Sequence, residues 1–407
     1  MFLGRREFLT VAGGVLVGLG ALGGRAWGGA VGSAGATGSS GAAGAAGKRL
    51  VVIYLAGGND GLNTVAPYGM GPYYDLRPRL AIKEAEALPL AGKLGLHPNL
   101  KAMKGFYDAG RLTIVQGVGY PNPDRSHFRS YDIWATGQTK GVSPVGWLGR
   151  YLDLSAAAGA GPLRAVAVGA SVPKPLVGGS GAAVAIESLN EMKLKGTPAA
   201  TAAIREMYGL GSGPLALVRG RGEAALAAAD ALQRMASGYK AGASYPKGNP
   251  LGNSLQLIVK LLAGGGGTQV LFTTFGAFDE HAGEKAHHDN LMLQFDQAVA
   301  AYQQDLAANG LGGSVLTLVY SEFGRRAKEN GSGGTDHGTA APVFLLGDGL
   351  RGGLVGEHPS LTDLQDFDLK LGIDFRSIYA TLLAGWLGQE PDAVLGQRYE
   401  RLPLLKT

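Results

Sequence analysis

The 407-residue chain contains no cysteine. This absence excludes disulfides, thiol catalysis and thiolate metal ligands, so a bound metal would need histidine, carboxylate or hydroxyl ligands. Charged residues are scarce, at 17% of the chain, and the formal net charge is +5. The first thirty residues carry +2 of it (Arg5, Arg6 and Arg25 against Glu7), which leaves +3 for the rest. With so small a charge and no basic stripe interleaved with aromatics, we expect no nucleic-acid partner.

The amino terminus has the pattern of an export signal. Residues 4–10, GRREFLT, form a twin-arginine pattern, and an apolar but glycine-diluted stretch at 11–24 follows. That stretch is short for a membrane-spanning helix. We predict that residues 1–30 are a twin-arginine signal peptide and that 31–47, almost wholly Gly, Ala and Ser, are a flexible linker. The expected partner is the twin-arginine export machinery, and the expected location is the periplasm or cell exterior, with no stable membrane span after processing.

The remaining chain alternates apolar runs with helical patterns. The runs predict strands at 48–55, 112–115, 165–168, 269–273, 315–320 and 343–346. The helices are expected at 98–109, 126–135, 253–263, 288–308 and 375–387. This alternation predicts an α/β fold over 48–407: a doubly wound, mostly parallel sheet with helices on both faces. The segment 141–265, richer in Ala, Gly and Pro, is predicted to be a partly helical insertion or cap, with helices near 197–208 and 222–238.

Polar residues of unusual chemistry stand where the predicted strands end. In open α/β sheets, ligands gather at the carboxyl ends of the strands. The residues in such loops are Asn59, Asp60, Ser126, His127, Asp279, His281, Glu322, Asp336 and His337. They are therefore the first candidates for a functional site.

Each candidate also has a purely structural interpretation. Asp60 lies in a Gly-Gly-Asn-Asp-Gly turn, where its side chain could simply cap the backbone. Ser126 could be a helix N-cap, or a hydroxyl at a helix start whose free N–H groups suit an anion. Arg125 and Arg129 flank it and could bind an oxyanion bidentately.

The later motifs leave similar alternatives open. Asp279 and His281 are two residues apart, so on an extended segment both point the same way and can reach one ion. His288, in a polar loop with His287, is a further possible ligand. Glu322 could be a ligand or an ion-pair partner of Arg325, and Asp336-His337-Gly338 could be a simple turn. Taken together, Asp60, Asp279, His281, Glu322 and His337 supply the oxygen and imidazole ligands that one or two divalent ions (Zn, Mn, Mg or Ca) prefer.

Five stretches carry a resemblance to a known group. They are LAGGNDGLNTVAPY, LTIVQGVGYPNPDRSHFRSYDIWATG, FDEHAG, SEFGRR and TDHGTAAPVFLLG. Through them the chain resembles the twin-arginine-exported bacterial group known as domain-of-unknown-function family 1501, which in turn resembles the alkaline phosphatase superfamily of phosphatases, sulfatases and phosphoglycerate mutases. The resemblance implies a doubly wound α/β sheet, two divalent metals and a Ser, Thr or formylglycine nucleophile.

Residue by residue, the resemblance implies these roles. Asp60 matches the acid that binds the second metal, and Ser126 matches the nucleophile. His281 and His337 match first-metal histidines. Glu322 falls where the superfamily has the Asp of an Asp-His pair.

The chain departs from the superfamily in three places. The acid before His281 is two residues away rather than four. Phe323 stands where the second-metal histidine would be. Ser126 precedes a histidine rather than lying in a sulfatase-type motif, so formylglycine chemistry is not expected.

The sequence thus favours an exported metal-dependent hydrolase of a small anionic ester, a phosphate or a sulfate. Ser126 would attack, and Arg125 or Arg129 would balance the oxyanion charge. The alternative is a non-catalytic binding or assembly protein on the same fold, which the phenylalanine at 323 favours. A glycoside hydrolase acting through Asp279 and Glu322 would need two carboxylates about 5 to 10 Å apart across a sugar-shaped cleft.

Overall fold

The structure, a computed structural model, describes residues 47–156, 163–189, 216–265 and 267–406, together with isolated positions between 199 and 206. The predicted signal peptide, the predicted linker up to residue 46 and most of the predicted helix near 197–208 lie outside the described residues. None of the described helices combines the length and the apolar character that crossing a membrane requires.

The centre of the fold is a nine-stranded sheet in the order β11-β5-β10-β9-β1-β8-β6-β7, with β12 also paired to β5. Its strands are β1 (Arg49–Ala56), β5 (Leu112–Gly119), β6 (Ala165–Val168), β7 (Ala183–Ile186), β8 (Val270–Gly276), β9 (Val315–Ser321), β10 (Ala341–Leu346), β11 (Gly353–Val355) and β12 (Ile373–Asp374). Only β10 runs antiparallel to its neighbours; the other pairs are parallel. The predicted α/β fold with a mostly parallel sheet is confirmed, and all six predicted strands belong to this sheet.

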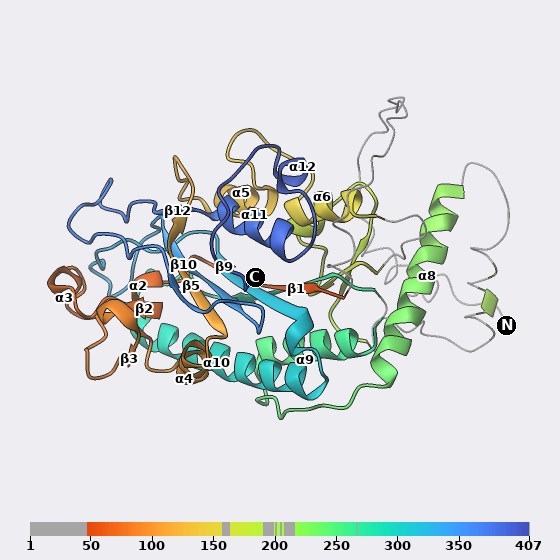
Figure 1. The fold of residues 1–407 in the computed structure, drawn as a ribbon, viewed down its shortest axis with the longest axis horizontal. Helices are drawn as coiled ribbons and strands as arrows, with labels where there is room; N and C mark the ends of the chain where they lie inside the picture. The colour runs from red at the N-terminus through yellow and green to blue at the C-terminus, as the bar shows by residue number, and fades with distance from the viewer. Residues whose placement is uncertain are drawn as a thin grey trace.

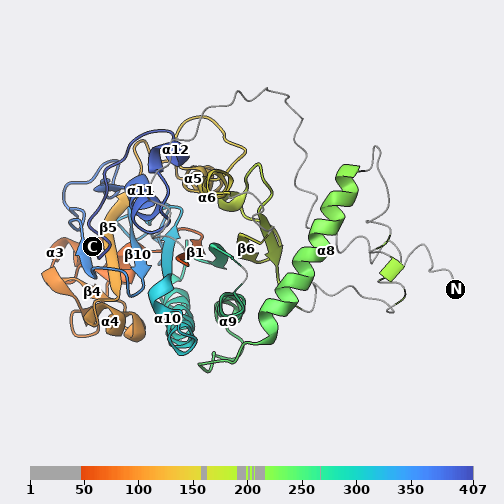
Figure 2. The ribbon, with the colours of Figure 1, turned by 45° about the vertical axis from the view of Figure 1, so that its right-hand side comes forward.

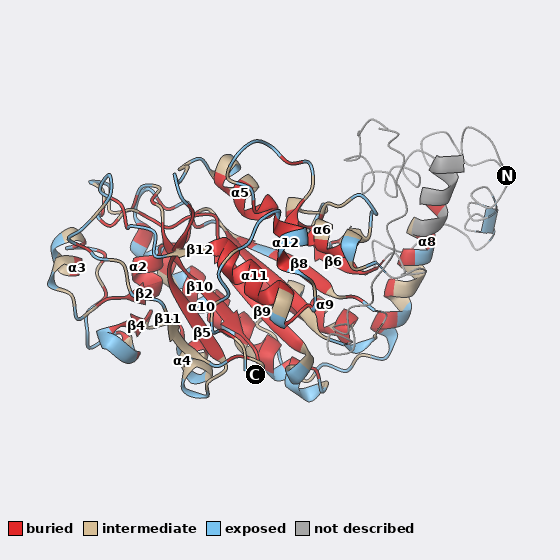
Figure 3. Cartoon of the chain, turned by 45° about the horizontal axis from the view of Figure 1, so that its top comes forward, coloured by how far each residue is buried: buried red, intermediate tan, exposed pale blue. Residues whose placement is uncertain are grey.

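Helices cover both faces of the sheet (Figure 1). One layer consists of α5 (His127–Thr136), α6 (Trp147–Leu154), α11 (Phe375–Gly385) and α12 (Pro391–Leu395). The other consists of α4 (Lys101–Asp108), α8 (Ala216–Ser237), α9 (Pro250–Ala263) and α10 (Glu284–Ala308). β1 shows why both are needed: Leu50 and Val52 pack into the first layer and Val51 and Ile53 into the second, because successive strand residues point to opposite faces. Figure 3 shows the resulting buried interior.

The described parts of the segment 141–265, residues 141–156, 163–189 and 216–265, include strands of the main sheet and helices that pack beside it. β6 pairs with β8 and β7 with β6, so both strands extend the main sheet. α9 packs against the sheet and α10, and α8 lies beyond it at the side of the molecule (Figure 2). The run 165–168 was predicted as a strand and is β6, whereas β7, in a stretch rich in small residues, was not predicted.

A smaller, three-stranded sheet lies beside the main one. It consists of β2 (Val65–Ala66), β4 (Gly95–Leu96) and β3 (Leu88–Pro89) in that order. Two short helices, α2 (Gly61–Thr64) and α3 (Gly71–Leu76), follow β1 in the same region. α2 begins directly after the turn that follows β1, so these elements start at the carboxyl end of that strand.

Candidate metal centre

Three histidines and one aspartate from separate segments meet at the carboxyl edge of the sheet. Asp279 and His281 follow β8, and His127 is the first residue of α5, after β5. His337 precedes β10. Because β10 runs antiparallel to β9 and β5, its first residues lie at the edge where those strands end. We call these four side chains the histidine centre.

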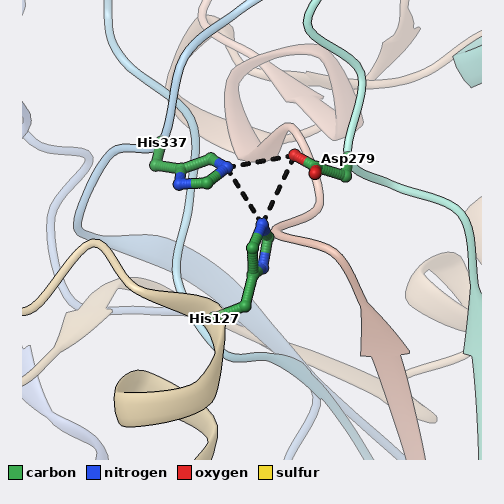
Figure 4. A group of neighbouring side chains, drawn as sticks. All are labelled: His127, Asp279 and His337. Atoms are coloured by element: carbon green, nitrogen blue, oxygen red, sulfur yellow. Dashed lines mark hydrogen bonds and ion pairs between the residues drawn. The ribbon is translucent and has the colours of Figure 1, made fainter.

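Ring nitrogens of His127 and His337 and the carboxylate of Asp279, three of the four side chains of the histidine centre, face one another (Figure 4). Nε2 of His337 lies 2.9 Å from Nε2 of His127 and 3.0 Å from Nε2 of His281. Oδ1 of Asp279 lies 3.0 Å from Nε2 of His337, 2.9 Å from that of His281 and 3.4 Å from that of His127. Neighbouring ligands of a tetrahedral ion with bonds of about 2.0 Å are about 3.3 Å apart. The spacing of His127, His337 and Asp279, whose ligand atoms all lie within 4.8 Å of one another, is therefore that of ligands around one ion. His281 contacts two of these three residues.

The other ring nitrogen of each histidine faces an oxygen. Nδ1 of His127 lies 2.7 Å from Oε1 of Glu322, and Nδ1 of His337 lies 2.8 Å from the backbone oxygen of Arg125. Nδ1 of His281 lies 3.4 Å from Oδ1 of Asp336. A backbone oxygen or an ionised carboxylate only accepts hydrogen bonds, so each Nδ1 carries the hydrogen. Metal-binding histidines are usually oriented by such a partner.

This arrangement leaves the Nε2 atoms of His127 and His281 and a carboxylate oxygen of Asp279 all close to Nε2 of His337. In a neutral imidazole that donates through Nδ1, Nε2 has no hydrogen and only accepts. Acceptors about 3 Å apart repel, and a shared proton or a cation removes the repulsion. The residues present therefore fit a divalent ion bound by imidazole and carboxylate.

The buried side chain of Arg325 forms an ion pair with Asp279 and so holds the carboxylate in position. Its guanidinium is 1% exposed and Nη2 lies 2.8 Å from Oδ1 of Asp279. The same group donates to the backbone oxygens of Gly57, Gly58, Phe278 and Thr335. Burial alone would raise the pKa of Asp279, but the hydrogen bond and the positive charge of Arg325 hold it well below its ordinary value. Asp279 therefore stays ionised. One interpretation of the sequence paired Arg325 with Glu322, but in the structure Arg325 forms its ion pair with Asp279.

Glu322 lies behind His127 rather than in the centre. Its side chain is 1% exposed and also accepts from the backbone N–H of Gly57 at 3.0 Å. Burial would raise the pKa of Glu322, but the hydrogen bond with His127 helps to hold it below its usual value. The imidazole of His127 stands between Glu322 and Asp279, so these carboxylates do not face each other across an open cleft as a glycoside hydrolase would require.

Phe323, where the superfamily pattern has an imidazole, packs against the centre. Its ring centroid lies 4.8 Å from that of His127 and 4.9 Å from that of His337. Gly58 makes this possible, because a Cβ on Gly58 would come within 2.4 Å of the phenylalanine ring. The ring supplies an apolar wall that fixes the two imidazoles.

An open cleft of about 450 Å³ adjoins the histidine centre. Among the described residues it is lined by Tyr54, Ala56, Gly57, His127, Phe128, Tyr131, Ala277, Asp279 and Glu322, with no lysine or arginine. Phe128 is 91% exposed, an unusual position for so large an apolar side chain. The cleft therefore offers an aromatic surface beside a carboxylate-bearing centre.

Asp60, predicted to bind a metal, is not brought into the histidine centre. Its carboxylate is buried, forms an ion pair with Arg77 and accepts from the backbone N–H of Leu62 at 3.2 Å. Asn59 is also buried, and its amide hydrogen-bonds Thr64. Both residues are thus engaged in structural contacts at the start of α2.

Ser126 lies at the N-cap position of α5 but its side chain makes no capping hydrogen bond. It is exposed and is not among the residues lining the cleft, although its neighbour His127 is in the centre. The guanidiniums predicted to bind an oxyanion are engaged elsewhere: Arg125 with Asp368, and Arg129 with Asp132. Their contacts do not support an oxyanion role for either arginine.

Two further possible ligands, Asp336 and His288, lie at different places: Asp336 beside the histidine centre and His288 in the protein interior. Asp336 orients His281, as described above. His288 is buried on α10 and belongs to a second group with Glu280 and Glu284. Sequence reasoning gave His127 only a secondary place. The signal was its position beside Ser126, directly after a strand, where it reaches the same edge as His337.

The chain belongs to the family described as "Protein of unknown function (DUF1501)", whose family model matches residues 113–395. The predicted family is confirmed. A search of curated proteins found no match.

Several solved structures share a limited likeness with the chain. Ps i-CgsB, solved in complex with k-i-k-neocarrahexaose, is 12% identical with a TM-score of 0.37, over 87% of this chain and 73% of that one. The alkaline phosphatase from the Antarctic bacterium TAB5 is 14% identical with a TM-score of 0.31, over 74% of this chain and 92% of that one. The lipoteichoic acid synthase LtaP from Listeria monocytogenes is 8% identical with a TM-score of 0.31, over 76% and 66%. Similarities this low say nothing about the roles of individual residues, so the site is interpreted from its own side chains.

Proposed function

We propose that this DUF1501 protein is a metal-dependent hydrolase of small phosphate or sulfate esters. One observation carries the proposal: Nε2 of His127, His281 and His337 and a carboxylate oxygen of Asp279 converge beside an open cleft. The ester class rests on the motif resemblance described above.

His127, His337 and Asp279 would hold the ion, with His281 beside them. Two imidazoles and one carboxylate suit Zn²⁺ or Mn²⁺ better than Mg²⁺ or Ca²⁺, which prefer oxygen ligands. When bound, such an ion supplies positive charge that polarises an ester oxygen. Glu322, Asp336 and the backbone oxygen of Arg125 would keep the rings oriented.

The charge of the cleft makes the activity dependent on the ion. Asp279 and Glu322 are the charged side chains that line it, and both are acidic. Their fields repel an anionic ester unless a divalent cation offsets them. We therefore expect no measurable binding of substrate to the metal-free protein.

Ser126 is the proposed nucleophile. Its hydroxyl is exposed, makes no cap hydrogen bond and lies at the start of α5, next to His127. Oγ would bond to phosphorus or sulfur and give its proton to water, while the bond to the ester oxygen breaks and that oxygen leaves as the alcohol after taking a proton from water. A second water would then attack phosphorus or sulfur and break its bond to Oγ, which releases phosphate or sulfate and restores the hydroxyl. The free N–H groups at the start of α5 can stabilise an anion there.

A binding function remains the second candidate, and a specific observation favours it. The three groups that the sequence assigned to chemistry, Ser126, Arg125 and Arg129, do not line the cleft, and both arginines are engaged in ion pairs. In this alternative, the histidine centre binds a metal for assembly or recognition without turnover.

A hydrolysis assay separates the two candidates. The metal-replete protein should release p-nitrophenol from p-nitrophenyl phosphate or p-nitrophenyl sulfate, and chelation should abolish release. H337A should lose both the ion and the activity. A fully metal-loaded protein without turnover on aryl phosphates, aryl sulfates or their diesters would favour binding alone.

We also propose that the twin-arginine machinery exports the protein to the periplasm or cell exterior. The support is the twin-arginine pattern of residues 4–10. A reporter fused after residue 47 should be exported, and replacing Arg5 and Arg6 with lysine should stop its export. Export of both fusion proteins alike would contradict the proposal.

A further inference from the structure

A second group of metal-ligating side chains lies inside the protein, separate from the histidine centre. It consists of Glu280, Glu284 and His288, and we call it the buried group. Glu280 is 4% exposed, Glu284 0% and His288 2%. Each offers one ligand atom, and these atoms all lie within 4.8 Å of one another.

The residues of the buried group come from two neighbouring segments of the chain. Glu284 and His288 are four residues apart on α10, so they share one face of the helix. Glu280 comes from the extended loop before it. Because successive residues of an extended segment point to opposite sides, Asp279 and His281 face the histidine centre while Glu280 faces inward.

Two polar atoms of the buried group have neither a hydrogen-bond partner nor an ion-pair partner among the described residues. They are Oε1 of Glu284 and Nε2 of His288. Oε1 of Glu280 lies 2.8 Å from Nδ1 of His287. The other atom of each side chain is engaged: Oε2 of Glu284 accepts from Oγ1 of Thr335 at 2.6 Å, and Nδ1 of His288 lies 3.3 Å from Oε2 of Glu280. An unsatisfied buried polar group costs about 1–3 kcal/mol. Two such atoms in one interior group point to an occupant that satisfies both.

The charges of the neighbourhood are also unbalanced. Asp60 interacts with both Glu284 and His288, and Arg77 interacts with Asp60 and Glu284. Burial and the charge of Asp60 raise the pKa of Glu284 to about 10, so without a cation this carboxyl keeps its proton. Asp60 and Glu280 then stand against one guanidinium, that of Arg77. Buried carboxylates are costly unless they are paired, and a divalent cation that replaces the proton on Glu284 would pair all three.

We infer that Glu280, Glu284 and His288 form a second cation site, which takes a divalent transition-metal ion such as Zn²⁺ or Mn²⁺. Two carboxylates and an imidazole suit these ions. Ligands on opposite sides of an ion with bonds of about 2.0–2.2 Å lie about 4.0–4.4 Å apart, within the spacing of this group. The ion would join the loop at Glu280 to the start of α10, where Glu284 also accepts a hydrogen bond from Thr335, two residues before His337. The site does not depend on the proposed activity.

Native mass spectrometry of the full chain tests this inference by counting bound ions. After loading with Zn²⁺ and removal of free metal, the wild type should carry two ions. The double variant H127A/H337A, which dismantles the histidine centre, should carry one. Adding E284Q and H288Q to that variant should bring the count to zero. E329Q is the matched control, because Glu329 is a buried carboxylate paired with Arg79, and it should leave two ions.

The outcome for H127A/H337A alone decides the matter if the variants of the buried group fail to fold. One ion retained by folded H127A/H337A supports the site, and none overturns it, since a proton then occupies the group instead. An ion retained equally by the H127A/H337A/E284Q/H288Q protein also overturns it. A chelator series gives a second readout: the buried ion should leave more slowly than that of the half-exposed histidine centre.

Discussion

Oε1 of Glu322 lies 2.7 Å from Nδ1 of His127, and this contact fixes the ring so that its Nε2 faces Asp279 and His337. Glu322 itself is buried and touches no other ring of the centre. It is therefore a positioning residue: it sets the tautomer and the direction of a ligand without being one.

E322Q should weaken metal binding at the histidine centre by about 10- to 100-fold, the usual cost of losing such a partner. The amide keeps the size but no longer guarantees the hydrogen on Nδ1. Competition with a chelator measures the affinity, and E329Q serves as the control. Unchanged affinity in folded E322Q would show that the contact does not position His127.

S126A separates turnover from metal binding. The proposed nucleophile lies beside the centre but contributes no ligand, so metal content should stay at the wild-type level. The rate constant kcat for an aryl ester should fall by about 100-fold or more, because the covalent route is lost. Full activity in S126A would reject this nucleophile while leaving the metal centre intact.

Phe128 should contribute to substrate binding and not to stability. Its side chain is 91% exposed, so F128A should change the free energy of unfolding by no more than about 0.5 kcal/mol. The KM for an aryl ester should rise several-fold because the cleft loses an aromatic surface. L154A is the control, since Leu154 is half-exposed at the end of α6. Equal kinetics for F128A and the wild type would contradict a substrate-binding role.

Asp60 and Arg77 should stabilise the fold in a pH-dependent way. Burial alone would raise the pKa of Asp60, but Arg77 lowers it to about 2 from the ordinary 3.8. A carboxylate with a lowered pKa contributes stability that is complete above about pH 4 and is lost as the pH falls toward 2. D60N leaves Arg77 buried without its partner and should cost about 3–5 kcal/mol at pH 7.

Urea unfolding between pH 2 and 7 measures this effect. The difference between the wild type and D60N should shrink as the pH falls below about 4. A difference that is constant over this range would show that Asp60 does not carry the charge. Loss of metal from the histidine centre at low pH affects both proteins alike, so the comparison isolates the ion pair.

Arg325 should be irreplaceable by lysine. Its guanidinium donates to Asp279 and to four backbone oxygens, and a single ammonium cannot reach them all. R325K should lower the free energy of unfolding by about 3 kcal/mol or more, since hydrogen bonds from a charged group contribute about 1.5–3 kcal/mol each. R79K, at a half-exposed pair with Glu329, should cost less than about 1 kcal/mol. Equal stability of R325K and R79K would contradict this account of the buried guanidinium.

The sheet was largely predictable because its strands are buried on both faces. The run 165–168 was predicted with the bounds that β6 has, and the other predicted strands differ from β1, β5, β8, β9 and β10 by a few residues at their ends. The position of β6 within the sheet was not predictable. Pairing of β6 with β8 depends on contacts between segments about a hundred residues apart, which composition does not encode.

The site was predictable as a region but not in its detailed roles. Strand ends brought Asp279, His281 and His337 together, as the sequence suggested. No local pattern shows that Arg77, 17 residues away, takes the carboxylate of Asp60. The same holds for Glu322, whose partner His127 is 195 residues distant. Such choices are decided by tertiary packing.

Anomalous X-ray diffraction from crystals of the Zn²⁺-loaded protein tests the central claim most directly. The account predicts a strong peak bonded to Nε2 of His127 and His337 and to Oδ1 of Asp279, at about 2.0–2.2 Å from each. The absence of a peak at this position, with the three side chains placed as in Figure 4, would contradict it.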